Sequence, residues 1–461
     1  MRFIECLKEE IKKGRYIVIP DIKRFSPKEG DLLMGRNPVD VAVSLVEAGA
    51  PVLSVVTEST EFKGSMELLK SIVKASNVPI LRKDFIYTKE DLIETKAAGA
   101  SAILLMCSCI TKEEMRYLYH EAIEMGLDPL VETHTKEELE FATELGAKLV
   151  GINNRNILEL ERDDGTVSRT RHLARYAPKD AILVSESSIQ SPEEVRKVIQ
   201  SGADVALVGT AIWKAKDTEI FYKMLCSPIS VKICGLKRQG DVMTCMKNGV
   251  EILGFVVEYP VDVPWNLMRE ETKVLIKLVS KPHKSCIVTG GKPEDIIDLA
   301  RELKPDMVQL HYNETLEDTK LIAEILCEEG IEIIKTVPLS EEDQLLSFGT
   351  TNIKEIVESL SQTKVSALLV DGRGPANASG IGMKVDSELF QKVKQFSSKE
   401  VILAGGINPD NLEEILKETC AKYIDIMTGA QKTAGEKDEG KIKQIMNTVA
   451  NYKIAEGEEI C

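Results

Sequence analysis

Sixteen short apolar runs of strand length, separated by amphipathic segments, constrain the fold of this 461-residue chain more than any other feature. Eight fall in the first half, at residues 17–23, 52–58, 79–85, 102–107, 128–134, 149–155, 182–188 and 205–211. Eight more fall in the second half, at residues 230–236, 252–258, 285–291, 307–313, 332–338, 367–373, 401–407 and 423–429. The intervening segments, such as 135–148 and 409–422, have helical periodicity and begin with residues that favour helix starts.

This regular alternation of strand and helix predicts parallel sheets, and eight strand–helix units is the number that closes a barrel. We therefore predict an α/β fold of two tandem (β/α)8 TIM barrels, with a doubly wound open sheet as the alternative. The join falls near residues 226–230, so the predicted domains are residues 1–226 and 227–461. A monomer is compatible with this organisation because the two barrels are covalently joined.

The composition argues against several classes of partner. The formal net charge of -15 is spread along the chain without a basic block, so we expect no nucleic-acid partner. No run approaches the roughly 18 consecutive apolar residues of a membrane span, and the first segment lacks the apolar core of a signal peptide. We therefore expect a cytoplasmic protein without membrane contact.

Cysteine and histidine are too dispersed to predict a metal centre. Of the ten cysteines, only Cys107 and Cys109 lie close together in the sequence, and the five histidines are also scattered. His134 and His311 each follow an apolar run, and we expect them to be packed or solvated side chains. The sequence therefore predicts no disulfide framework, no metal and no cofactor.

Polar side chains stand near the carboxyl ends of six runs in the first half, where a parallel barrel opens its common mouth. They are Lys23, Glu58, Lys83, Glu132, Asn153 and Glu186. Any one of them can be a solvated loop residue, but their convergence from six strands is typical of a catalytic site. The run 79–85 is the sharpest case, because the charges of Arg82, Lys83 and Asp84 follow an apolar stretch directly.

The last two runs of the first half indicate the class of substrate. In barrels of this kind the loops after strands 7 and 8 often hold a phosphate, and Gly209 and Thr210 suit a backbone that must approach one closely. Together with the cations Lys23 and Lys83, they predict a small anionic phosphorylated substrate. Glu132 and Glu186 are then available for proton transfer.

Four ordered motifs in the first half resemble indole-3-glycerol phosphate synthase. They are "IPDIKRFSPKEG" at 19–30, "PILRKDFI" at 79–86, the stretch 130–156 and "LVSESSI" at 183–189, and the resemblance covers most of residues 15–216. It implies an enzyme that closes the pyrrole ring of indole on a carboxyphenylamino-deoxyribulose phosphate, with loss of carbon dioxide and water.

By this resemblance, Lys83 is the general acid at the substrate's carbonyl, Glu132 its acid/base partner, and Lys23 the cation that holds the charged groups. The remaining matching positions are Asp21, Asn153, Glu186 and Ser187 in the catalytic group, and Ser26, Pro27 and Phe85 in the substrate pocket. The chain departs from the family pattern at Asp21, where a glutamate is usual, and at Ser188, where a glycine is usual. The N-terminal extension that partly covers the family's active site looks curtailed.

In the second half, Cys234 is expected at the carboxyl end of the first strand and Asp371 at the carboxyl end of the sixth. A thiol becomes a base when a nearby cation or helix N-terminus lowers its pKa, and an aspartate opposite it could donate a proton if it is kept protonated. Taken alone, Cys234 could equally be a core residue.

The motifs around these two residues resemble those of phosphoribosylanthranilate isomerase, and the resemblance extends from about residue 229 to 447. The matching motifs are "KICGL", "VQLH" at 308–311, "IIKTV" at 333–337, "VDGRG" at 370–374, "SGIG" at 379–382, "LAGGINPDN" at 403–411 and "IDIMTGA" at 424–430. The resemblance implies an Amadori rearrangement with Cys234 as general base and Asp371 as general acid. It implies a phosphate held by Gly405, Gly406, Thr428 and Gly429.

One departure concerns recognition of the anthranilate carboxylate. Where the family supplies an arginine after strand 2, this chain has Trp265, which cannot neutralise a carboxylate. Arg269, four residues on, is the candidate to replace it. Tyr312 also stands where the family usually has glycine.

The sequence thus predicts a bifunctional enzyme of tryptophan biosynthesis. The second barrel would isomerise N-(5-phosphoribosyl)anthranilate to the ketose phosphate that the first barrel converts to indole-3-glycerol phosphate. One alternative keeps the synthase and gives the isomerase-like barrel an altered or lost substrate specificity. Another is a non-catalytic phosphosugar-binding protein.

Overall fold

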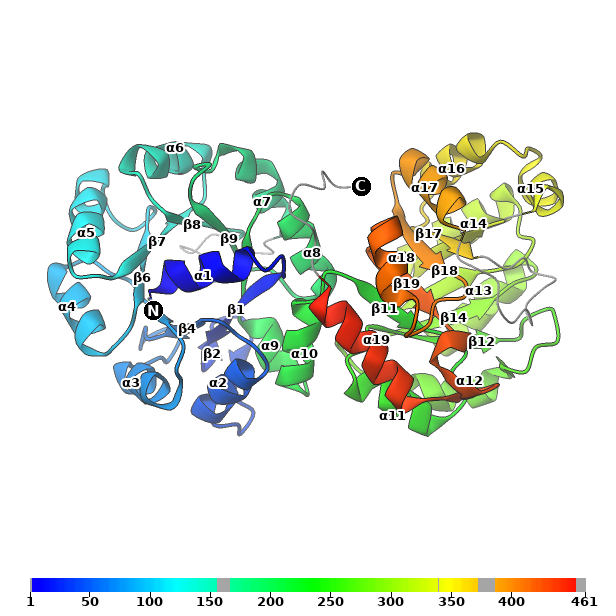
Figure 1. The fold of residues 1–461 in the computed structure, drawn as a ribbon, viewed down its shortest axis with the longest axis horizontal. Helices are drawn as coiled ribbons and strands as arrows, with labels where there is room; N and C mark the ends of the chain where they lie inside the picture. The colour runs from blue at the N-terminus through cyan, green and yellow to red at the C-terminus, as the bar shows by residue number, and fades with distance from the viewer. Residues whose placement is uncertain (1, 156–165, 339, 372–385, 453–461) are drawn as a thin grey trace. The chain divides into compact units, whose positions relative to one another are not determined.

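Parallel strands close into a barrel in each of two units of the chain (Figure 1). The computed structural model describes residues 2–155, 166–338, 340–371 and 386–452. The first unit ends at Ser227 and the second runs from Pro228 to Tyr452. The predicted motif at 379–382 lies outside the described residues.

The barrel of the first unit has the strand order β1-β10-β9-β8-β7-β6-β5-β4, with every pair parallel. Its strands are β1 (Ile17–Ile22), β4 (Leu53–Val56), β5 (Ile80–Lys83), β6 (Ala102–Met106), β7 (Asp128–Thr133), β8 (Leu149–Asn153), β9 (Ile182–Glu186) and β10 (Val205–Val208). Its helices are α1 (Phe3–Ile11), α2 (Pro38–Glu47), α3 (Met66–Ala75), α4 (Lys89–Ala97), α5 (Lys112–Glu124), α6 (Lys136–Leu145), α7 (Ser168–Leu173), α8 (Pro192–Gln200), α9 (Thr210–Lys214) and α10 (Thr218–Leu225). A short hairpin of β2 (Phe25–Ser26) and β3 (Gly30–Asp31) follows β1.

The second unit repeats this plan, because β11 pairs in parallel with both β12 and β19 and so closes the ring. Its strands are β11 (Ser230–Ile233), β12 (Ile252–Val257), β14 (Lys284–Thr289), β15 (Met307–Leu310), β16 (Glu332–Val337), β17 (Ala367–Asp371), β18 (Glu400–Ala404) and β19 (Tyr423–Ile426), with β13 (Asn266–Leu267) beside β12 and a hairpin of β20 (Gln431–Thr433) and β21 (Glu436–Lys437). Its helices are α11 (Gln239–Lys247), α12 (Arg269–Ile276), α13 (Pro293–Leu303), α14 (Leu316–Glu328), α15 (Glu341–Phe348), α16 (Ile353–Ser361), α17 (Ser387–Phe396), α18 (Leu412–Thr419) and α19 (Glu439–Asn451). The predicted pair of eight-stranded barrels is confirmed, and the open sheet is wrong.

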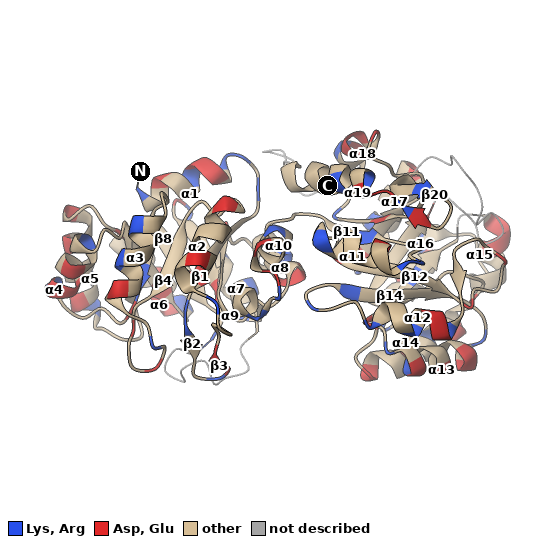
Figure 2. Ribbon diagram, turned by 90° about the horizontal axis from the view of Figure 1, so that it is seen from below, with Lys and Arg blue, Asp and Glu red and all other residues tan. Residues whose placement is uncertain are grey.

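Local sequence signals set where the helices begin. Three threonines, Thr88, Thr111 and Thr135, each accept a hydrogen bond from the backbone N–H three residues on. The acidic side chain of that later residue in turn accepts a hydrogen bond from the backbone N–H of the threonine. Such reciprocal caps satisfy N–H groups that a helix start leaves without partners. Both acidic and basic residues occur on the helices of each unit (Figure 2).

Helix α1 closes the amino end of the first barrel. Phe3 and Leu7 are fully buried in one cluster with the first residues of several strands, such as Ile17 of β1 and Ala102 of β6. The Arg2 guanidinium pairs with the buried carboxylate of Asp128, the first residue of β7, and the backbone N–H of Ile4 donates to it at 3.0 Å. The N-terminal segment described here therefore seals the end opposite the predicted site, and does not cover the site.

Candidate active sites

A cavity of about 540 Å³ opens at the carboxyl ends of the strands of the first unit. An adjoining cavity of about 400 Å³ shares some of its lining residues, which include Lys23 and Lys83. The predicted residues that line at least one of the two are Asp21, Lys23, Glu58, Lys83, Phe85, Glu132, Asn153, Ser187, Gly209 and Thr210. Ser26, which is fully buried, and Pro27 line neither cavity.

Glu186 lies fully buried at the end of β9 and lines neither cavity, but it contacts Lys83, which lines both. Lys83 Nζ lies 3.4 Å from Glu186 Oε2. Burial raises the pKa of Glu186 to about 7; the negative charges of Glu132 and Asp21 add to the rise, and the positive charge of Lys83 opposes it. A carboxyl group with a pKa near neutrality can both give and take a proton at physiological pH.

Glu132, at the end of β7, is the second buried carboxyl group of this site. Burial raises its pKa, and the positive charge of Lys83 opposes that rise. A hydrogen bond from the Asn153 side chain also opposes the rise, and both residues line the cavity, so the carboxyl group lies within reach of a substrate. His134 packs behind it, with Nε2 3.7 Å from Glu132 Oε1. That histidine is a packed side chain, as the sequence predicts.

The space that Glu186 occupies is provided by Gly151 on the neighbouring strand β8. A Cβ atom at Gly151 would lie 2.0 Å from Glu186 Oε1, which no real contact allows. Gly151 is not among the residues predicted for the site, although a glycine inside an apolar strand often marks a close approach by another group.

Asp21 is held on both its side chain and its backbone. Ser54 Oγ donates to Asp21 Oδ1 at 2.6 Å, and Trp213 Nε1 donates to the Asp21 carbonyl at 3.0 Å. A Cβ atom at Gly209 would lie 3.2 Å from both Asp21 and Lys23, so glycine lets the loop after β10 pass close to these side chains. This arrangement places the predicted phosphate-binding backbone beside a cation.

The loop after β9 adopts an uncommon conformation at the position where the family usually has glycine. Ser187 and Ser188 have φ values of 64° and 61°, in the left-handed region that costs energy for residues with a Cβ. Asn154 Nδ2 donates to the carbonyls of Glu186 and Ser187 at 2.9 and 3.2 Å, and Arg155 Nε donates to Ser188 Oγ at 3.1 Å. Arg155 lines both cavities, and the sequence analysis missed it.

The second unit has its own cavity of about 540 Å³, at the carboxyl ends of its strands. Cys234, after β11, and Asp371, at the end of β17, both line it, and they are 5% and 3% exposed. Aromatic side chains of Tyr259 and Trp265 form much of its apolar wall. The structure therefore brings the predicted base and acid to a single cavity.

Burial raises the pKa of Cys234, although two buried lysines oppose the rise. Lys232 is neutralised by Asp425, with Nζ 2.6 Å from Oδ2. Lys437 Nζ donates to the backbone carbonyls of Cys234 and Met427 at 2.5 and 3.0 Å. Desolvation therefore outweighs the attraction of these two cations in the protein alone. Sequence reasoning had not identified Lys232, Asp425 or Lys437.

His311, expected to be a packed or solvated side chain, lies in the cavity instead. Its Nε2 atom is 3.8 Å from Asp371 Oδ2, and its Nδ1 atom is 2.9 Å from Thr336 Oγ1 and 3.0 Å from Gln309 Nε2. These contacts orient the imidazole beside the predicted acid.

The predicted role of Arg269 in carboxylate binding is contradicted. Arg269 does not line the cavity. Its guanidinium forms a bidentate pair with Glu258 at 2.8 and 2.9 Å, and also contacts Asp298 at 3.0 Å and Glu302 at 2.5 Å. The three carboxylates raise its pKa, and their contacts occupy the donors that a substrate carboxylate would need.

The loops predicted to hold a phosphate in the second unit come together. Gly405 and Gly406 follow β18 with φ values of 96° and 65°. Thr428 and Gly429 begin a short turn after β19, where a Cβ atom at Gly429 would lie 1.9 Å from the Ile407 carbonyl oxygen. The two loops therefore touch, although the four glycine and threonine positions do not line the cavity described above.

Within the described residues, no group of three or more histidine, cysteine, aspartate or glutamate side chains could hold a metal ion. None of the helices in that part of the chain is long and apolar enough to cross a membrane.

Comparison with known proteins matches each half to a separate family. The model "Indole-3-glycerol phosphate synthase" matches residues 1–225, and "N-(5'phosphoribosyl)anthranilate (PRA) isomerase" matches residues 231–448. The resemblance predicted from the motifs is confirmed for both halves.

Individual relatives agree with this division. An indole-3-glycerol phosphate synthase of Thermococcus kodakarensis is 44% identical over 214 residues, which are 46% of this chain and 93% of the relative. One from Pyrococcus abyssi is 43% identical over 217 residues, covering 47% and 93% respectively. A multifunctional tryptophan biosynthesis protein of Schizosaccharomyces pombe is 30% identical over 96% of this chain, which spans only 60% of that relative's length.

Proposed function

We propose that this chain, which belongs to the indole-3-glycerol phosphate synthase family and carries a phosphoribosylanthranilate isomerase domain after it, catalyses two steps of tryptophan biosynthesis. The second unit converts N-(5-phosphoribosyl)anthranilate to 1-(2-carboxyphenylamino)-1-deoxyribulose 5-phosphate. The first unit closes the pyrrole ring of that ketose phosphate, which loses carbon dioxide and water to give indole-3-glycerol phosphate. The order of the units is opposite to the order of the reactions.

In the first unit, the observation that carries the proposal is that Lys83 and Glu132 line one cavity and that the buried carboxylate of Glu186 lies 3.4 Å from Lys83. Lys83 donates a proton to the carbonyl oxygen of the ketose while the aryl ring attacks the carbonyl carbon. Glu132 exchanges protons with the intermediate as carbon dioxide and water leave. Lys23 and the loop at Gly209 hold the charged groups of the substrate.

In the second unit, Asp371 protonates the ribose ring oxygen as the ring opens, and Cys234 removes the proton from C2 of the sugar. The resulting enolamine has a C1=C2 double bond; it gains a proton at C1 and loses the hydroxyl proton at C2, which gives the ketose. Because burial raises the pKa of Cys234, the thiolate is the minor form at neutral pH, and ionisation precedes the proton abstraction.

A second candidate function is favoured by one observation in the second unit. Trp265 forms part of the cavity wall and Arg269 is held elsewhere, so no lysine or arginine among the described residues lines the cavity. A barrel of this kind could isomerise an N-aryl ribosylamine phosphate that lacks the carboxylate. Steady-state turnover with anthranilate-derived and aniline-derived substrates distinguishes the two functions.

The decisive experiment measures both reactions in the purified full-length protein. The variant Lys83→Met is expected to lose indole-3-glycerol phosphate formation and to retain isomerase turnover. Cys234→Ala is expected to lose isomerase turnover and to retain indole-3-glycerol phosphate formation. The reaction that each variant retains serves as its internal control for intact protein. Undiminished synthase turnover in Lys83→Met, or undiminished isomerase turnover in Cys234→Ala, contradicts the assignment of that residue. A cytoplasmic location and a monomeric state stay predictions.

A further inference from the structure

The three consecutive charges at the end of β5 have different partners. Successive side chains of a strand point to opposite faces of the sheet. Lys83 reaches Glu186 at 3.4 Å, whereas Arg82 lies buried on the side of helix α4 and is only 5% exposed. A charge with so little access to water is costly unless it is fully paired.

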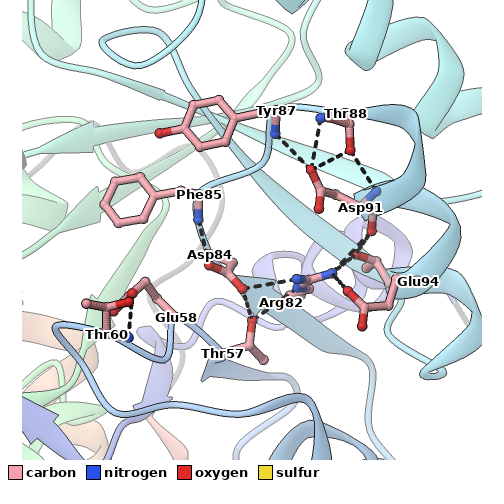
Figure 3. Close-up of polar contacts among 11 residues, drawn as sticks. Thr57, Glu58, Thr60, Arg82, Asp84, Phe85, Tyr87, Thr88, Asp91 and Glu94 are labelled. Atoms are coloured by element: carbon pink, nitrogen blue, oxygen red, sulfur yellow. Dashed lines mark hydrogen bonds and ion pairs between the residues drawn. The ribbon is translucent and has the colours of Figure 1, made fainter.

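The guanidinium of Arg82 meets this requirement, as Figure 3 shows. It donates to Thr57 Oγ1 at 3.1 Å, Thr95 Oγ1 at 3.0 Å, the Asp91 carbonyl at 3.2 Å, Glu94 Oε2 at 3.2 Å and Asp84 Oδ2 at 3.0 Å. These groups come from the ends of β4 and β5 and from helix α4. Arg82 therefore ties two neighbouring strand ends to the helix behind them.

Asp84 completes the arrangement on the other side of Lys83. Its Oδ2 atom accepts from Arg82 and also from Thr57 Oγ1 at 2.5 Å, and its Oδ1 atom accepts from the backbone N–H of Phe85 at 2.9 Å (Figure 3). The backbone N–H of Thr57 donates to the Lys83 carbonyl at 3.0 Å. The backbone on both sides of Lys83 is thus held by charge-assisted or buried hydrogen bonds.

We propose that Arg82, Asp84 and Thr57 form a clamp that positions Lys83 for proton donation, and that this, rather than substrate binding, is the role of the charged pair flanking Lys83. The inference rests on the proposed function of the first unit. The backbone of Lys83 sets the direction in which its long side chain leaves the strand, and so the range of positions that Nζ can reach. A displacement of about 1 Å at a reacting group costs about 10²-fold in rate.

The test uses Asp84→Asn and Thr57→Val in the full-length protein. The amide of the first variant keeps the shape of the carboxylate but loses the charge that Arg82 requires, and the valine of the second keeps the shape of threonine but loses the hydroxyl. We expect each variant to lower the synthase kcat by about 10- to 100-fold with KM changed less than about threefold. Asp84 lines the cavity of about 540 Å³ but Thr57 lines neither cavity, so a kcat loss in Thr57→Val cannot come from a lost substrate contact.

Glu94→Gln is the matched control, because Glu94 also contacts Arg82 but its side chain is 52% exposed. We expect its kcat to equal that of the wild type. A pH profile adds a readout that a merely structural defect would not move. The charge of Lys83 lowers the pKa of Glu186, so a displaced Lys83 shifts the midpoint of the acidic limb of kcat to higher pH.

The outcomes separate the two claims. If the wild type forms no indole-3-glycerol phosphate, the proposed function fails and the clamp fails with it. If the wild type turns over and both folded variants match it in kcat and in pH midpoint, the clamp alone is overturned. A rise in KM with kcat unchanged also overturns the clamp, since that result assigns Asp84 to substrate binding.

Discussion

Replacing Gly151 by alanine tests whether the buried carboxylate of Glu186 must occupy its present place. The added Cβ would lie 2.0 Å from Glu186 Oε1 and 3.2 Å from Cδ, where ordinary van der Waals contact begins at 3.4 Å. The carboxylate must therefore move by roughly 1 Å or more, away from β8, and its contact with Lys83 moves with it. A displacement of that size costs about 10²-fold in rate, which corresponds to about 2.7 kcal/mol of activation free energy.

The assay is the fluorescence of indole-3-glycerol phosphate formed from the ketose phosphate, with kcat and KM determined separately. We expect the loss in kcat, and we expect overpacking to lower the free energy of unfolding by about 1–3 kcal/mol. Gly240→Ala is the control, because a Cβ atom there meets nothing within 4 Å. A folded Gly151→Ala protein with wild-type kcat would refute the reasoning, since Glu186 could then be displaced without consequence.

Further predictions concern both units. In Gly254→Ala the added Cβ lies 2.9 Å from Cys234 Sγ, so we expect about a tenfold loss of isomerase kcat with synthase turnover unchanged in the same preparation. We expect the isomerase kcat to rise with pH above neutrality, because burial raises the pKa of Cys234; a flat profile would argue against thiolate catalysis. The free energy of unfolding of the first unit is expected to fall as pH rises from 4.5 through about 7, because the folded pKa of Glu186 lies above its unfolded value and the stabilisation is complete only below 4.5. Urea denaturation at several pH values across this range measures that free energy. If the free energy of unfolding falls equally steeply with pH in Glu186→Gln, the pH dependence belongs to another group. Lys304 has a φ of 50° at the end of α13, a conformation that glycine adopts without strain. We therefore expect Lys304→Gly to raise the free energy of unfolding by about 0.5–1 kcal/mol, measured by thermal unfolding. A less stable variant would contradict this prediction.

Much of the site could be predicted because the relevant information is local. A strand and the residue that ends it both lie within a short window, so the sequence predicts Lys83, Glu132 and Cys234 at strand ends. Parallel connections then require those ends to meet on one face. The same reasoning explains the error at Arg269, because proximity along the chain does not show which carboxylates surround a guanidinium.

The sequence by itself determined the alternation of strand and helix, the number of units and the residue types at the strand ends, because these depend on side chains within a few positions of each other. Only the tertiary structure decided which of those groups are buried, and therefore which way their pKa values move. It brought Gly151 against Glu186, Lys437 beneath Cys234, and Thr57 against Asp84. Burial and the distance between charges depend on neighbours that arrive from remote strands, and no local pattern encodes them.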